Sequence, residues 1–326
     1  MINKKEEEME VFSCNGKKWY VGDVEINGYK SIVQNNNLIY QGEFLGGKYH
    51  GYGILYNLEN NILYQGEFSN GLFHGKGKIY YSNGFIKYIG HFRNSQLNGY
   101  GKYYTKKGKI VYAGNFSDGK YNGDGILYNH NMKPIYEGTF LNNTSSGFGK
   151  FYKYVNNIQY LYYLGYCHNG LFNKIGILYH ANGNIFYSGD FNMGVFDGIG
   201  ITFNPYGMKL YEGEFLNGNY HGFGVQYIHG QKIYEGSFQK NKYHGYGISY
   251  KNNHKEYEGV WIKNMQRNVR SGYIKKLIDF SIKYKINMLP VHGKDIMDIS
   301  NMVFDKKESL QDSDYIAIQN VLMKLY

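Results

Sequence analysis

The sequence predicts a mainly β protein: an elongated, single-layer array of antiparallel β-hairpin repeats, followed by a small α-helical C-terminal extension. Three observations predict this fold. A Tyr-x-Gly-x-Phe pattern recurs along most of the chain, a second glycine pattern follows it at a fixed offset, and most steps of the repeat are 23 or 24 residues. Two short strands fit into such a period but a crossover helix does not, so successive strands must be antiparallel.

The Tyr-x-Gly-x-Phe pattern marks the first strand of each hairpin. Including degenerate copies, it occurs about eleven times, with clean copies at Tyr40, Tyr64, Tyr88, Tyr112, Tyr136, Tyr187, Tyr211 and Tyr234 and degenerate ones at Tyr20, Tyr163 and Tyr257. Tyrosine, glycine and phenylalanine share one face of a strand because side chains alternate with a period of two. The residues that define the repeat, and that we expect to be structural, are Tyr40, Gly42, Phe44, Tyr64, Gly66, Phe68, Tyr211, Gly213, Phe215, Tyr234, Gly236 and Phe238.

The second pattern, a small or polar residue before Gly-x-Gly, marks the second strand. It follows every clean copy, whereas the degenerate copy at Tyr163 keeps only Gly176. Turn residues separate the strands, as in the hairpin of Tyr211, where Asn217-Gly218 and His229-Gly230 are the expected turns. Glycine weakens a strand, so we expect its role here to be space: tyrosine and phenylalanine rings of neighbouring strands lie over the bare backbone.

This combination of Tyr-x-Gly-x-Phe, Asn-Gly-x-x-His-Gly-x-Gly and a period of 23 or 24 residues resembles the MORN repeat family, from roughly Tyr20 to Ile262. The resemblance implies a non-enzymatic scaffold or adaptor for protein partners, in the cytoplasm and associated with cytoskeleton or membrane. The alternative it implies is a peripheral membrane module that binds acidic phospholipids such as phosphoinositides. Similar repeats precede catalytic domains in some proteins, but the chain after Trp261 is far too short for one, so we expect no enzyme.

Three regions are predicted: an N-terminal tail (1–18), the repeat array (19–262) and a helical extension (263–326). Apolar residues recur at helical spacing from Ser271 to Ile286 and again from Ser313 onward. These helices could cap the last repeat, or they could dock a partner or an anionic membrane. The membrane alternative would use Lys275, Lys276, Lys283 and Lys285.

The charge favours acidic partners, because the formal net charge is +10. Exposed aromatics beside lysines would suit a peptide, self-association into a homodimer, or anionic lipid. Nucleic acid is disfavoured because the fold already uses the aromatic residues. The lysines in question cover three neighbouring copies: Lys48, Lys76, Lys78, Lys102, Lys106, Lys107 and Lys109.

No catalytic, cofactor or metal site is predicted. His50, His74, His221 and His244 occupy one phase of the repeat and come nearest to a metal site, but asparagine, serine or aspartate replaces them in other copies. That exchange fits a residue that forms hydrogen bonds beside a turn better than a ligand. Cys14 and Cys167 form no disulfide or zinc pattern. Residues 1–10 have no apolar segment, so we expect a protein that is not secreted.

Overall fold

The computed structural model describes residues 20–21, 24–34 and 36–267, and every regular element within them is a β-strand. The predicted tail at 1–18, the two predicted helices and Lys275, Lys276, Lys283 and Lys285 lie outside the described residues. Backbone contacts divide the chain into two compact units, Met1–Gly147 and Phe148–Tyr326.

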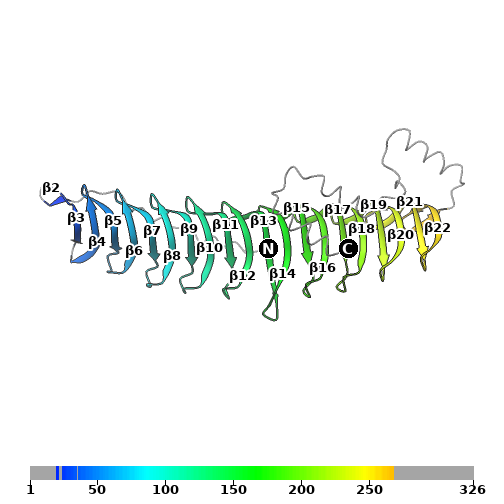
Figure 1. The fold of residues 1–326 in the computed structure, drawn as a ribbon, viewed down its shortest axis with the longest axis horizontal. Helices are drawn as coiled ribbons and strands as arrows, with labels where there is room; N and C mark the ends of the chain where they lie inside the picture. Colours follow the sequence, from blue (N-terminus) through cyan, green and yellow to red (C-terminus); the bar gives the residue numbers. More distant parts are fainter. Residues whose placement is uncertain (1–19, 22–23, 35, 268–326) are drawn as a thin grey trace, which may run out of the picture. The chain divides into compact units, whose positions relative to one another are not determined.

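The first unit is built from hairpins in which each strand from β3 to β12 pairs antiparallel with its neighbours along the chain (Figure 1). Its strands are β1 (Tyr20–Val21), β2 (Val24–Glu25), β3 (Gly28–Gln34), β4 (Asn37–Leu45), β5 (Lys48–Tyr56), β6 (Ile62–Ser69), β7 (Leu72–Tyr80), β8 (Ile86–Arg93), β9 (Gln96–Tyr104), β10 (Ile110–Ser117), β11 (Lys120–Tyr128) and β12 (Pro134–Leu141). The next strand, β13 (Thr144–Val155), contains the boundary between the units.

The second unit repeats the arrangement, with every strand from β14 to β23 paired antiparallel to its chain neighbours. The strands are β14 (Ile158–His168), β15 (Leu171–Tyr179), β16 (Ile185–Asn192), β17 (Val195–Phe203), β18 (Lys209–Leu216), β19 (Asn219–Ile228), β20 (Gln231–Gln239), β21 (Lys242–Lys251), β22 (His254–Ile262) and β23 (Met265–Arg267). The predicted antiparallel hairpins are therefore confirmed in both units.

The turns have the predicted residues. In the hairpin of Tyr211, β18 and β19 are joined by Asn217 and Gly218, whose φ angles are 49° and 76°. Positive φ at both central residues matches the right-handed twist of the strands, and asparagine and glycine adopt it at low cost. Short Asn-rich turns of this kind set the register of each hairpin.

The aromatic residues of the repeat form the core. Tyr211 is fully buried, its ring stacks on Tyr220 with centroids 3.7 Å apart, and Phe215 and Phe238 meet it edge-on at 5.1 Å. Its hydroxyl donates to the Glu214 carbonyl at 2.8 Å, which satisfies the one polar atom of the ring. Each tyrosine therefore links its own hairpin to the next.

The same packing builds the first unit. Tyr64 is fully buried, stacks on Phe73 at 3.9 Å and meets Phe68 and Phe92 edge-on at 5.0 and 5.2 Å. One hairpin alone is marginally stable in water, so contacts between hairpins such as Tyr64–Phe92 supply the stability of the array.

The glycines have two distinct roles, of which the sequence predicted one. A Cβ on Gly213 would lie 2.5 Å from the Cα of its cross-strand partner Gly224 and 2.8 Å from the Tyr211 hydroxyl. The tyrosine thus lies over a glycine pair, one member of which belongs to its own strand rather than a neighbouring one. The other role is conformational: Gly222 takes a φ of 51° where the register shifts between β18 and β19.

The degenerate copies behave differently from one another. Tyr163 is fully buried and stacks on Phe172 at 3.8 Å, although Lys174 occupies the left-handed position with a φ of 58°. In the last copy Trp261 replaces phenylalanine and meets Tyr234 edge-on at 5.5 Å. The copy at Tyr20 forms only the two-residue strands β1 and β2, which pair with each other.

Candidate binding site

The residues written x in the two glycine patterns, together with the residue that follows Gly-x-Gly, form a second face of the sheet, opposite the tyrosine and phenylalanine rings; we call it the outer face. Cross-strand pairing aligns these residues into rows. On the first unit one row contains Gln65 on β6, Lys78 on β7, Ile89 on β8 and Lys102 on β9. Because the core is on the other face, the side chains in this row take no part in the aromatic packing.

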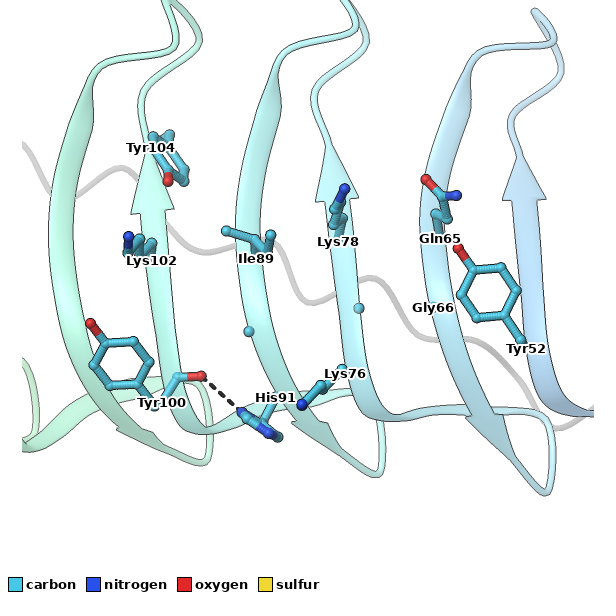
Figure 2. A pocket seen from close by; sticks show the side chains of 12 residues that line it. Tyr52, Gln65, Gly66, Lys76, Lys78, Ile89, His91, Tyr100, Lys102 and Tyr104 are labelled. Atoms are coloured by element: carbon cyan, nitrogen blue, oxygen red, sulfur yellow. Dashed lines mark hydrogen bonds between the residues drawn. The ribbon is translucent and has the colours of Figure 1, made fainter.

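A groove with a volume of about 470 Å³ lies on this part of the outer face (Figure 2). Lys78 and Lys102 flank Ile89 in its central row, and Lys76 is paired with His91 in the next row. Tyr52 and Tyr100 are 50% and 54% exposed, which is unusual among the aromatic residues of the repeat. The residues that line the groove are Tyr52, Gln65, Gly66, Lys76, Gly77, Lys78, Ile89, Gly90, His91, Tyr100, Lys102 and Tyr104.

The groove is cationic and lacks a neutralising acid. No aspartate or glutamate belongs to its lining, and within the described residues the ammonium groups of Lys76, Lys78 and Lys102 make no ion pair. The nearby Glu67 is occupied by the backbone, since its carboxylate accepts the Lys76 amide hydrogen at 2.8 Å. The His91 ring is held against the Tyr100 carbonyl at 3.1 Å. An anion could enter without displacing an existing carboxylate.

The structure brings together three of the lysines that sequence reasoning grouped with exposed aromatics. Lys76, Lys78 and Lys102 line the groove, whereas Lys48, Lys106, Lys107 and Lys109 do not. Lys109 instead donates to the His130 carbonyl at 2.9 Å.

Sequence reasoning did not single out Gln65, Ile89, His91, Tyr104 or the exposed rings of Tyr52 and Tyr100 as a site. All of them except Tyr104 occupy x positions of the repeat, so the pattern contained the information. Aligning the x positions of successive hairpins into cross-strand rows would have revealed it.

From sequence alone, the acidic residues at the x positions of Tyr-x-Gly-x-Phe suggest a solvated face; Glu214 is exposed as that requires, yet several of these carboxylates also serve the fold. Glu214 and Asp190 accept backbone amide hydrogens from Phe223 and Ile199, at 2.9 and 3.0 Å. Each bond satisfies an amide at the point where the strand register shifts. Glu212 is 2% exposed. These carboxylates are part of the fold.

The four histidines of the repeat lie on separate strands: His50 on β5, His74 on β7, His221 on β19 and His244 on β21. Two of them contact the aromatic core through the backbone: the carbonyls of His74 and His221 accept hydrogen bonds from the hydroxyls of Tyr64 and Tyr211, at 3.4 and 3.2 Å. Among residues 20–21, 24–34 and 36–267, no three histidine, cysteine, aspartate or glutamate side chains are grouped so as to hold a metal ion. Cys167 is buried and forms no disulfide within the described residues.

A run of paired hairpins with an aromatic core on one face and an open, charged groove on the other defines a β-hairpin repeat protein. The MORN repeat family model matches eight segments of the chain, at residues 40–56, 64–85, 88–110, 112–131, 136–156, 187–203, 211–228 and 234–255. The chain belongs to the MORN repeat family, whose repeats are modules for interaction with proteins or membranes. A search of curated proteins finds no match. The described part of the chain contains no helix long and apolar enough to span a membrane.

Proposed function

We propose that this protein is a non-enzymatic scaffold that holds partner proteins on the outer face of its hairpin array, in the cytoplasm at a cytoskeletal or membrane-associated structure. One observation carries the proposal. The tyrosine and phenylalanine face is buried in the core, where residues such as Tyr40 and Tyr64 are fully buried. The outer face lies outside that core, and its side chains can differ in charge and shape from one repeat to the next. A surface of this kind suits recognition, because its side chains can change while the repeat stays intact.

The groove on the first unit supports a binding role more than a purely structural one. Exposed tyrosines and lysines that make no ion pair are not needed for the core, and rings that are half exposed favour contact with a partner. Aromatic residues at an interface supply much contact area at low conformational cost.

The scaffold is tested by capture with the purified full-length chain, followed by reconstitution of each captured protein alone and in pairs. A scaffold is expected to hold two different partners in one complex, measured as the mass of the particle in solution. Variants with reversed charge on the outer face should lose partners while keeping their circular dichroism spectrum. The absence of any direct protein partner after reconstitution would contradict the proposal.

A second candidate function is binding to acidic phospholipids, including phosphoinositides, and the observation that favours it is the cluster of lysines without ion pairs at Lys76, Lys78 and Lys102. Flotation with neutral, anionic and phosphoinositide-containing vesicles tests it. Binding to phosphoinositide vesicles that persists at physiological salt would favour the membrane module. Binding that salt removes equally from every anionic vesicle would leave the protein scaffold as the better account.

A further inference from the structure

We propose that the groove on the first unit binds an extended acidic peptide that runs across strands β7 to β9 and carries an acidic side chain at every third residue. The proposal rests on the proposed scaffold function and adds the chemistry of one partner. Three properties of the groove carry it: charge, spacing and the distribution of exposed rings.

Charge comes first. Lys76, Lys78 and Lys102 converge on a groove whose lining contains no carboxylate. Lysine ammonium groups at the edge of a groove attract carboxylates and select against cationic chains. The Glu67 carboxylate accepts the Lys76 backbone amide hydrogen at 2.8 Å and forms no ion pair with the groove lysines that would compete with an incoming carboxylate.

The spacing of the lysines selects an extended ligand. Lys78 and Lys102 share a row but are separated by β8, so their backbones lie two strand spacings apart, about 9.6 Å. A polyproline II helix repeats every three residues, or about 9.3 Å. Acidic side chains at every third position of such a peptide would therefore meet both lysines. One turn of the polyproline II helix would span the distance from β7 to β9.

The apolar groups complete the match. Ile89 lies in the row between Lys78 and Lys102, and Tyr100 stands in the adjacent row with 54% of its surface exposed. Proline-rich segments dock in grooves lined by aromatic residues, because the ligand is already extended and loses little entropy on binding. Ile89 and Tyr100 offer that surface to the residues between the acids.

A second copy of this chain is a poorer occupant. On the outer face of the second unit, Glu212 and Glu235 take the positions of Gln65 and Ile89, but both are already paired, with Lys209 and Lys232 at 3.1 and 2.6 Å. An acidic segment without such internal partners would compete better for the groove.

The test uses the purified full-length chain and a fluorescent peptide of four Glu-Pro-Pro units, with fluorescence anisotropy as the readout at physiological salt. One control peptide has the same composition with its glutamates contiguous, and another replaces glutamate with lysine. The periodic acidic peptide is expected to bind about tenfold more tightly than the contiguous one. Equal affinity for the two acidic peptides would overturn the predicted spacing.

Matched variants locate the site. K76Q/K78Q/K102Q removes the three groove lysines, and K106Q/K107Q/K120Q removes three exposed lysines of the same unit that do not line the groove. The groove variant is expected to weaken binding about tenfold or more, and the control variant by less than about twofold. Equal loss in both variants, or preference for phosphoinositide vesicles over peptide as competitor, would overturn the proposal.

The scaffold function and the acidic-peptide site can be contradicted independently of each other. If the peptide does not bind but partner capture survives in the groove variant, the scaffold stands and its binding surface lies elsewhere. If the peptide binds in the groove but reconstitution yields no protein partner, the groove is a peptide-binding site and the proposed scaffold function is wrong.

Discussion

The outer faces of the two units differ in charge although their cores are the same. On the first unit, the row through Gln65, Lys78, Ile89 and Lys102 is cationic, and its lysines make no ion pair within the described residues. On the second unit, Glu212 and Glu235 take the positions of Gln65 and Ile89, and Val225 and Ile248 take those of Lys78 and Lys102.

Those carboxylates are compensated locally. Glu212 is paired with Lys209 at 3.1 Å and Glu235 with Lys232 at 2.6 Å, each lysine coming three residues earlier on the same strand. Tyr, Gly and Phe thus specify the same core in both units, while the row on the outer face carries carboxylates in ion pairs in one unit and, among the described residues, lysines without ion pairs in the other. The predictions below test this division of roles.

The largest expected effect is alkaline unfolding, and it should be common to both units. Burial raises the pKa of Tyr88 and Tyr112 in the first unit and of Tyr187 and Tyr211 in the second, and it raises the pKa of Tyr243 to about 12. A raised pKa in the folded state gives stability that is complete below the unfolded value of 10.0 and is lost as pH rises through the folded value. One step in tyrosinate absorbance, that of the buried rings, should therefore coincide with loss of the circular dichroism signal above pH 10; ionisation of all the tyrosines without unfolding would contradict the account.

Next in size is the substitution of a glycine under the tyrosine ring, which should cost the same in either unit. A Cβ on Gly66 or Gly213 would lie 2.5 Å from the Cα of the opposing glycine. We expect Gly66→Val and Gly213→Val each to lower the free energy of unfolding by about 3 kcal/mol or more, because the hairpins must separate to admit the side chain. Denaturant unfolding measures this, with Gly218→Asn as the control, since Gly218 has open space and a φ of 76° that asparagine tolerates. Unchanged midpoints for both valine variants would refute the packing account.

A smaller effect should rank two ion pairs of the second unit by their burial. Glu212→Ala removes the partner of Lys209 in a pair whose carboxylate side chain is only 3% exposed, and we expect a loss of about 1–2 kcal/mol. Glu258→Ala is the matched variant, because Glu258 is 33% exposed and its pair with Lys255 is better solvated, so its effect should be smaller. Thermal unfolding compares the two, and a larger loss for Glu258→Ala would reverse the ranking.

The smallest effect on stability is expected in the groove. K76Q/K78Q/K102Q should change the free energy of unfolding by less than about 0.5 kcal/mol, since none of the three ammonium groups is paired within the described residues. Chemical denaturation checks this. A large destabilisation would mean that these lysines serve the fold, and the contrast between the units would disappear.

Most of the fold could be predicted from the sequence because the same strand and turn patterns recur in every copy of the repeat. Tyr211, Gly213 and Phe215 lie on one face as alternation requires, and Asn217-Gly218 forms the predicted turn. The left-handed role of Gly222 could not be separated from the ring-over-backbone role of Gly224, because both are glycines in one pattern. A β-bulge is a register shift between two strands, which depends on pairing rather than on local residue type.

The groove was harder to predict than the fold. Lys78 and Lys102 are 24 residues apart in sequence and meet only through the row that Ile89 completes. Lys106 and Lys107 are also lysines and lie only a few residues after Lys102 in the sequence, but they do not line the groove. Likewise, Glu212 becomes buried by packing that its neighbours in sequence do not reveal.

The central claim, that the first unit's outer face is an acidic-peptide site separate from the fold, is tested most directly by zero-length carboxylate-to-amine cross-linking of the Glu-Pro-Pro peptide to the full-length chain. Mass spectrometry then identifies the lysines joined to peptide glutamates. The account predicts cross-links concentrated on Lys76, Lys78 and Lys102. Cross-links spread over exposed lysines such as Lys106, Lys107 and Lys120 as readily as over these three would contradict it.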